Sequence, residues 1–207
     1  MSSLDELVAS ALALRSSNAA ARPVMLGIVG PPGSGKSTLT AALRSELTDW
    51  SVIEMDGFHL ANEVLMTLGR RDRKGAPDTF DVDGFVSLLG RCADRGEQVI
   101  YGPRFVREIE EGIAGSLAIR PDSPGIIVEG NYLLLDSGGW ERVGPLLDAT
   151  WYVNTSPEEC RTRLVARAAQ TYGPVDGPRW VDTVDEPNAA RVRATACRAS
   201  RRVTLDR

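Results

Sequence analysis

Residues 30–37, Gly30-Pro-Pro-Gly-Ser-Gly-Lys-Ser37, decide the fold of this chain because they match the pattern G-x-x-x-x-G-K-S. In a loop of this type the glycines let backbone N–H groups surround a phosphate, and the lysine approaches the β/γ oxygens of a nucleotide. The chain has two lysines, Lys36 and Lys74, and one of them occupies the lysine position of the pattern. The loop therefore predicts a nucleoside triphosphate ligand.

The residues on either side of this loop have the patterns that the motif requires. Residues 23–29 form an apolar run typical of a buried strand, and Leu39, Leu43 and Leu47 repeat every four residues, as on one face of a helix. Phosphate binding is favoured at such a helix N-terminus because it carries positive potential. The residues expected to contact the nucleotide are Gly30, Pro31, Gly33, Ser34, Gly35, Lys36, Ser37 and Thr38.

The rest of the chain alternates between strand-like and helical segments. Strands are predicted at 24–29, 51–55, 97–101, 125–129, 149–153 and 202–205. Helices are predicted at 4–14, 36–48, 81–94, 141–147, 156–171 and 178–199. This alternation indicates an α/β fold of three layers, in which helices cover both faces of a mostly parallel, five-stranded sheet. We expect one P-loop nucleoside triphosphate hydrolase domain over residues 1–207, with a small lid.

Length and charge limit the functional classes. A chain of 207 residues that is 43% hydrophobic can bury a sizeable core. Its net charge of −4 argues against binding to nucleic acid or to an anionic membrane surface. The three cysteines lie far apart, and there is neither an apolar run of about 18 residues nor a signal peptide pattern. We therefore expect a cytoplasmic protein with reduced thiols. A homo-oligomer is left open.

Asp56 follows the predicted strand at 51–55, and Gly57, Phe58 and His59 come next. Ligands of open parallel sheets gather at the carboxyl ends of the strands, so Asp56 is expected beside the γ-phosphate. A carboxylate there can deprotonate an acceptor hydroxyl or hold Mg²⁺ through water. His59, the one histidine of the chain, is a candidate acceptor contact; a purely structural histidine is the alternative reading.

Glu129 ends a second strand-like run, residues 125–128, at the same predicted edge of the sheet. An acidic residue at this place is the usual outer-shell partner of the nucleotide's metal. Ser37, Glu129 and Asp56 are therefore the expected Mg²⁺ site.

Arg163 and Arg167 lie four residues apart on one face of the predicted helix at 156–171. Arginines that reach the γ-phosphate stabilise the charge of the transition state in phosphoryl transfer. The alternative reading is that these two arginines belong to a helix face that only contacts solvent. Residues 170–178 then carry Gly and Pro, which break a helix. A lid over approximately residues 161–180, closing on the phosphates, is the prediction.

These motifs together resemble the uridine kinase, pantothenate kinase and phosphoribulokinase group of P-loop kinases over nearly the whole chain. Residues 27–38 look like the first motif of that group. Residues 55–59 are similar to its Met-Asp-Gly/Ser-Phe/Tyr-His segment, whose Asp is the catalytic base. Residues 77–81 and 129–134 are similar to its Pro-Asp-Ala-Phe-Asp and Glu-Gly-x-Leu-Leu segments. The resemblance implies MgATP as the phosphoryl donor.

Three segments look most like a bacterial branch whose members are labelled nucleoside kinase-like or fructose transport system kinases: 73–81, 129–136 and 185–188. In that branch the Asp-Glu-Pro-Asn stretch at 185–188 would lie near the adenine, so Asn188 is a candidate nucleotide contact. The segment at 129–136 adds Tyr132 as a candidate acceptor contact.

The chain also departs from these relatives on the acceptor side, where loops at approximately 57–80 and 101–120 are expected. Gly75 stands where uridine kinases carry an aspartate for the ribose, and Arg73 and Lys74 precede it. This leaves room for an anionic or differently shaped acceptor, with Arg73 as a candidate contact. Val106 replaces an Asp before Arg107, which is still a candidate acceptor contact. In the lid helix, Ala168 stands where a His is expected.

The predicted function is transfer of the γ-phosphoryl group of MgATP to a hydroxyl of a small metabolite. A sugar, a nucleoside and a pantothenate-like alcohol all remain open as acceptors. The alternative is a nucleotide-dependent regulatory ATPase without a small-molecule acceptor. A GTPase would need an Asn-Lys-x-Asp motif, and the sequence has none.

Overall fold

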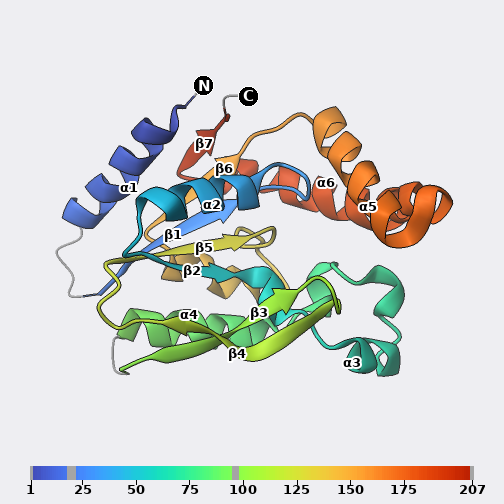
Figure 1. The fold of residues 1–207 in the computed structure, drawn as a ribbon, viewed down its shortest axis with the longest axis horizontal. Coiled ribbons are helices and arrows are strands. Elements are labelled where there is room, and N and C mark those ends of the chain that lie inside the picture. Colours follow the sequence, from blue (N-terminus) through green and yellow to red (C-terminus); the bar gives the residue numbers. More distant parts are fainter. Residues whose placement is uncertain (1, 18–21, 95–97, 206–207) are drawn as a thin grey trace.

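A computed structural model describes residues 2–17, 22–94 and 98–205. Within these residues five strands form one parallel sheet in the order β2-β5-β1-β6-β7 (Figure 1). The bounds of these strands are β1 (Val24–Val29), β2 (Ser51–Glu54), β5 (Gly125–Gly130), β6 (Ala149–Val153) and β7 (Arg201–Val203). The predicted mostly parallel, five-stranded sheet is confirmed.

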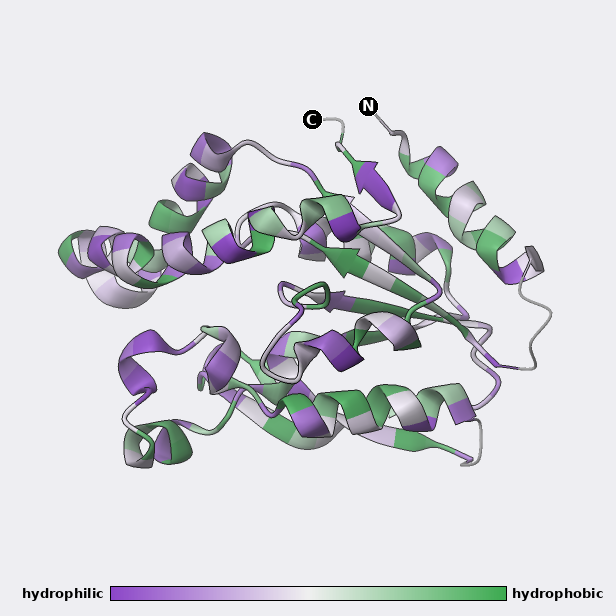
Figure 2. Cartoon of the chain, turned by 180° about the vertical axis from the view of Figure 1, so that it is seen from behind, coloured by the Kyte–Doolittle hydropathy of each residue, from purple (hydrophilic) through white to green (hydrophobic). Residues whose placement is uncertain are grey.

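Helices cover both faces of this sheet, as predicted. One face packs against α1 (Leu4–Ser17) and α2 (Lys36–Glu46), through residues such as Leu7, Leu39 and Leu43. The other face packs against α4 (Val82–Asp94), whose Phe85 and Leu89 are fully buried. Figure 2 shows hydrophobic residues along the strands between these layers. The central strands β1 and β6 are buried along their whole length, as continuous apolar runs in a covered parallel sheet require.

The predicted strand at 97–101 does not join the main sheet. Residue 97 lies outside the described residues, and β3 (Ile100–Val106) pairs antiparallel with β4 (Glu111–Ile119) as a separate hairpin. The sequence patterns did not predict β4 or the short helix α3 (Asn62–Thr67). Polar and apolar residues alternate only weakly along β4, and the strand is largely exposed. Its residues therefore lack the apolar pattern of a core strand.

Short helical turns replace parts of two predicted helices. The segment at 141–147 forms η4 (Trp140–Arg142) and η5 (Gly144–Leu146), because Gly144 and Pro145 interrupt a longer helix. The segment at 178–199 divides into a π-helical turn η6 (Val181–Asp185), α6 (Glu186–Ala194) and η7 (Ala196–Arg198). The loops before α4 hold three further 3₁₀ turns, η1 (Met55–Phe58), η2 (Arg71–Arg73) and η3 (Pro77–Thr79).

Helix α5 (Pro157–Trp180) begins as predicted and is interrupted as predicted. The Ser156 hydroxyl accepts a hydrogen bond from the Glu159 N–H at 3.2 Å, which caps the helix. Gly173 has φ 88° and ψ 169°, so its backbone leaves the helix, and Pro174 starts a second helical segment. That segment folds back closely, because a Cβ on Gly177 would lie 2.6 Å from the backbone nitrogen of Ala169.

Both ends of the described chain lie at the β7 edge of the sheet (Figure 1). The Ser2 N–H donates to the Thr204 carbonyl at 3.1 Å, and Ser2 forms a parallel bridge with Leu205. Among the described helices, none has the length and apolar character needed to cross a membrane.

Candidate functional site

The loop between β1 and α2 adopts the conformation that its glycines allow. Gly33 (φ 78°) and Gly35 (φ 95°) both have left-handed backbones, and a Cβ on Gly33 would lie 2.6 Å from the Cys160 carbonyl oxygen. Ser34 is buried, and its hydroxyl has no hydrogen-bond partner in the described part of the chain. An orphaned polar group in a glycine-rich turn at the start of α2 fits an anionic ligand.

Lys36 lies at the first position of α2 and is 7% exposed. Its Nζ donates to the Pro31 carbonyl at 3.2 Å and lies 3.9 Å from Glu129 Oε1. Burial lowers the pKa of Lys36, while Glu129 and Asp56 act in the opposite direction. The lysine is thus held over the loop, next to two acidic side chains.

Glu129 lies on β5, opposite Ile28 of β1 and Glu54 of β2. One of its carboxylate oxygens, Oε2, accepts a hydrogen bond from Ser37 Oγ at 3.2 Å. Burial raises the pKa of Glu129 to about 7, although Lys36 acts to lower it. Ser37 and Glu129 offer oxygen ligands only, a donor set that suits Mg²⁺.

Asp56 lies in η1, directly after β2, and lines the same cleft as Lys36 and Glu129. Arg107, from the end of the β3–β4 hairpin, places Nη2 3.7 Å from Asp56 Oδ2. The Asp56 carbonyl lies 2.8 Å from His59 Nδ1, so this ring nitrogen carries the proton. Burial lowers the pKa of His59, while Asp56 acts in the opposite direction. In the neutral ring, Nε2 is an acceptor.

The two predicted arginines of α5 both line the cleft, in different environments. Arg163 Nη1 donates to the Gly33 carbonyl at 3.1 Å, and Nη2 pairs with Glu159 at 2.5 Å. Within the described ranges, the Arg167 guanidinium has no hydrogen bond or ion pair. Arg163 therefore supports the loop, while Arg167 remains available to a ligand.

Asn188 of α6 also lines the cleft and is 5% exposed. Asp185, at the end of the π-helical turn η6, lies beside it on the cleft wall. Burial raises the pKa of Asp185 to about 6, and Arg167 acts to lower it. π-Helical turns are rare and often occur at functional sites, so this wall is a reasonable place for a ligand contact.

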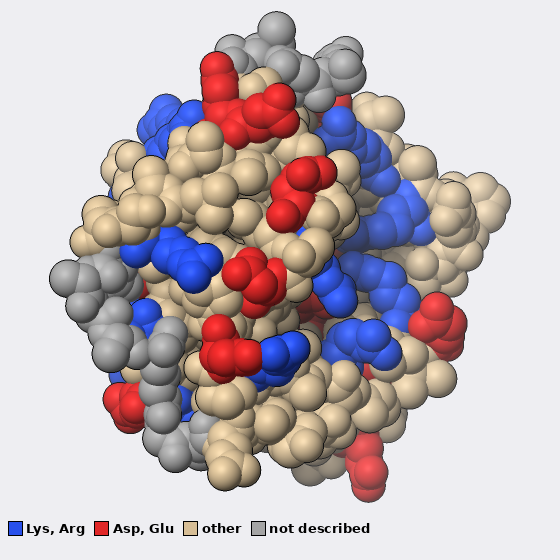
Figure 3. All heavy atoms as spheres, turned by 60° about the vertical axis from the view of Figure 1, so that its left-hand side comes forward, with Lys and Arg blue, Asp and Glu red and all other residues tan. Residues whose placement is uncertain are grey.

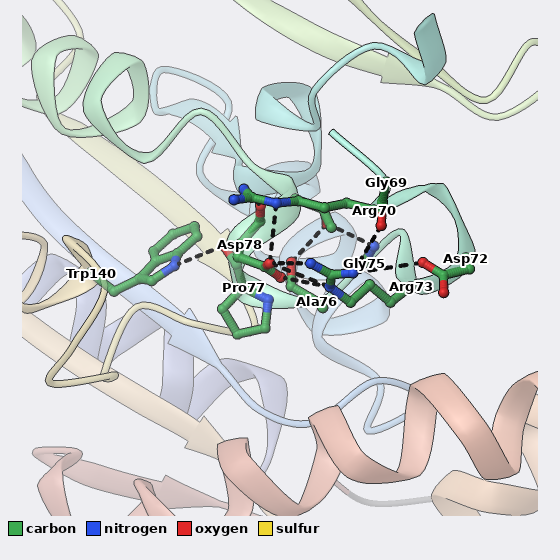
Figure 4. Close-up of polar contacts among 10 residues, drawn as sticks. Gly69, Arg70, Asp72, Arg73, Gly75, Ala76, Pro77, Asp78 and Trp140 are labelled. Carbon is green, nitrogen blue, oxygen red and sulfur yellow. Dashed lines mark hydrogen bonds and ion pairs between the residues drawn. The ribbon is translucent and has the colours of Figure 1, made fainter. Parts of the chain in front are cut away.

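Two predicted acceptor contacts do not line the cleft. Arg73 Nη2 forms an ion pair with Asp78 at 2.8 Å, and Arg73 Nη1 donates to the Gly69 carbonyl at 3.2 Å (Figure 4). Tyr132 is fully buried, and its hydroxyl donates to the Gly75 carbonyl at 2.5 Å. Both side chains instead hold the 69–80 loop in place from outside the cleft. Arg73 does so through Asp78 and the Gly69 carbonyl, and Tyr132 does so through the Gly75 carbonyl.

The described residues form one large cleft of about 1490 Å³ that joins these groups. Its first part is lined by the P-loop residues 32–38; Gly30 and Pro31 are not among the lining residues. Its second part is lined by residues that the sequence analysis did not select: Lys74, Phe80, Phe105, Glu108, Glu110, Tyr172 and Trp180. The Tyr172 and Trp180 rings stack at 4.9 Å between centroids, which joins the two segments of α5. No local pattern marks Lys74 over its neighbour Arg73, because both stand in the same basic stretch before Gly75.

The chain is similar to several kinases, although no family model matches it. A Schizosaccharomyces pombe protein provisionally named a uridine kinase is 33% identical over 179 residues, which are 81% of this chain and 74% of that protein. A pantothenate kinase of Enterococcus faecalis is 29% identical over 142 residues, 65% of this chain and 46% of that enzyme. The solved structure of a provisionally assigned fructose transport system kinase from Silicibacter sp. is 30% identical, with a TM-score of 0.87 and coverage of 98% of this chain and 100% of that one.

Proposed function

The chain belongs to the P-loop kinases related to uridine kinase and pantothenate kinase, which are small-molecule phosphotransferases, and we propose that it transfers the γ-phosphoryl group of MgATP to an alcohol. The observation that carries the proposal is the continuous cleft. The first part of the cleft, lined by the P-loop, and the second part, lined by residues such as Lys74 and Phe105, meet at Asp56. Asp56 lies there beside Lys36 and Glu129. A carboxylate between a donor site and an acceptor site is the arrangement that phosphoryl transfer to a hydroxyl needs.

In this reaction Asp56 takes the proton of the acceptor hydroxyl. The hydroxyl oxygen forms a bond to the γ-phosphorus, the bond from that phosphorus to the β–γ bridging oxygen breaks, and ADP leaves. Lys36 and Arg167 neutralise the oxygens of the transferred group, while Arg163 holds the P-loop through the Gly33 carbonyl. His59 and Arg107 contact the acceptor, and Asn188 contacts the nucleotide.

Mg²⁺ would be held by Ser37, with Glu129 and Asp56 in the outer shell, and would neutralise charge on the β and γ oxygens. The hydrogen bond from Ser37 to Glu129 supports this assignment, because it aims the hydroxyl and the carboxylate at one place. Residues 1–207 would act as one kinase domain, with residues 161–180 as the lid. The break at Gly173 supports a separate lid segment.

The test is an ATP-consumption screen over a library of hydroxyl-bearing metabolites, including sugars, nucleosides and pantothenate-like alcohols. We expect ADP formation that depends on one class of acceptor, with a product whose mass increases by one phosphoryl group. ADP release that no acceptor stimulates would favour the regulatory ATPase instead.

A further inference from the structure

Lys74 is a buried cation on the acceptor side of the cleft. Its side chain is 8% exposed, although lysine is among the residues that most rarely lose contact with water. Its Nζ donates to Asn62 Oδ1 at 2.8 Å and to the Glu110 carbonyl at 2.5 Å. These two bonds link the 69–80 loop to α3 and to the tip of the β3–β4 hairpin. An ammonium group has three N–H donors, so one of them is left over.

The partners of Lys74 are neutral, which is costly for a buried charge. No carboxylate in the described ranges forms an ion pair with Nζ within 4.0 Å. Burial lowers the pKa of Lys74, while Glu111 and Glu110 act in the opposite direction from beyond ion-pair distance. The Glu111 carboxylate itself accepts a hydrogen bond from the Asn62 N–H at 2.9 Å. The lysine thus keeps a charge that no side chain within ion-pair distance compensates.

The surroundings of Lys74 place that charge next to the proposed reaction centre. Its Nζ lies 5.5 Å from the centroid of the Phe105 ring, and Arg107 lies over the same ring at 6.0 Å. The His59 ring is 4.9 Å from Phe105, and its Nδ1 reaches the Asp56 carbonyl. Although the chain is acidic overall, Figure 3 shows Lys and Arg side chains gathered around a hollow on one side of the face drawn.

We propose that Lys74 binds an anionic group of the acceptor, a carboxylate or a phosphate, while the acceptor's hydroxyl points to Asp56. This inference rests on the proposed function and narrows it to alcohols that carry a negative charge. The neutral bonds to Asn62 and Glu110 position the ammonium, and the Phe105 ring lies beside both it and Arg107. Glu108 and Glu110 also line this part of the cleft, so they restrict the anionic group to the side of Lys74.

A binding experiment tests the site without turnover. Because the chain has two lysines, protein carrying ¹³C-labelled lysine gives two sets of side-chain signals, which Lys74→Met assigns. With the P-loop filled by MgADP, we titrate glycerol, glycerate and glycerol 3-phosphate, which share one skeleton. The Lys74 signal should shift saturably with glycerate, with glycerol 3-phosphate or with both, and not with glycerol. The anion that shifts the Lys74 signal shows whether the site takes a carboxylate or a phosphate. A signal that neither anion moves, or that glycerol moves equally, would overturn the proposal.

A kinetic experiment tests the consequence for specificity. The acceptor screen is arranged in pairs that differ only in one anionic group, and we expect the charged member to have at least about 10-fold higher kcat/KM. Lys74→Met should lower kcat/KM for the charged member by about 10–100-fold, mainly through KM, and leave the neutral member within about 3-fold. Arg44→Met removes an exposed cation outside this cleft and should change neither value.

The outcomes separate the two proposals. Preference for a neutral alcohol, or an unchanged ratio in Lys74→Met, would overturn the role of Lys74 and leave the kinase function standing. If no alcohol supports ADP formation, the kinase proposal fails, and the titration still decides whether Lys74 binds anions. If Lys74→Met does not fold, Lys74→Arg takes its place in the kinetics. This variant keeps the charge, so it should retain the preference for the charged acceptor. Because Lys36 is then the remaining lysine, its signal assigns the spectrum.

Discussion

Arg107 Nη2 lies 3.7 Å from Asp56 Oδ2, so the β3–β4 hairpin places a cation beside the carboxylate that follows β2. Both side chains are partly exposed, at 60% and 37%, so the pair adds little to stability. Its importance is chemical. The guanidinium lies where it can contact the same acceptor whose hydroxyl proton a general base at Asp56 would take.

Asp56→Asn should therefore lower kcat by about 10²-fold or more, because the amide cannot accept the hydroxyl proton. The affinity for MgADP, measured by titration calorimetry, should change by less than about 3-fold. Asp49→Asn provides the control, since Asp49 is an exposed aspartate 3.5 Å from Arg15 and outside the cleft. Turnover by Asp56→Asn within a few-fold of the unaltered protein would show that Asp56 is not the base.

The two arginines of α5 should give different kinetic effects. Arg163 is bonded to the Gly33 carbonyl and to Glu159, so Arg163→Met should weaken MgADP binding by loosening the P-loop. Arg167 has no such partner in the described residues, so Arg167→Met should lower kcat by about 10²-fold and change MgADP affinity little. Steady-state kinetics and calorimetry on both variants separate the two roles. Equal losses of nucleotide affinity would contradict the assignment.

Gly173→Ala should destabilise the protein by about 1–3 kcal/mol, because φ 88° with ψ 169° is a conformation that side chains rarely adopt. Gly144→Ala is the matched control. A Cβ at Gly144 would also meet nothing within 4 Å, but its φ is not in the left-handed region. Urea unfolding should place Gly144→Ala within about 0.5 kcal/mol of the unaltered protein. A loss as large as that of Gly173→Ala would refute the role of backbone strain.

Asp185 should make stability depend on pH. The pKa of Asp185 in the folded protein, about 6, is raised above the ordinary 3.8. Its contribution to the free energy of unfolding is therefore fully present below about pH 4 and is lost as pH rises through 6. Asp185→Asn does not titrate. The free energy of unfolding of this variant, relative to the unaltered protein, should therefore increase by about 1 kcal/mol between about pH 5 and about pH 8. A flat difference for Asp185→Asn would contradict the burial of its charge.

Local sequence patterns predicted most of the sheet and the donor half of the site. Buried parallel strands are continuous apolar runs, and a P-loop requires glycines at set positions, so both are written in contiguous residues. Asp56 and Glu129 could be selected because each directly follows or ends such a run. The β3–β4 hairpin escaped prediction because it is largely exposed and packs only in part against the core. The roles proposed for these residues, the cytoplasmic location and any oligomeric state stay predictions.

The sequence by itself determined that a nucleotide-binding loop lies between a buried strand and a helix, since every residue involved is a near neighbour in the chain. Only the tertiary structure decided which basic residue of the 69–80 loop faces the cleft. Arg73 and Lys74 are adjacent, yet Arg73 pairs with Asp78 while Lys74 is buried against Asn62, Glu110 and Phe105. That choice depends on partners 12 to 36 residues away, brought together by packing, and no local pattern encodes it.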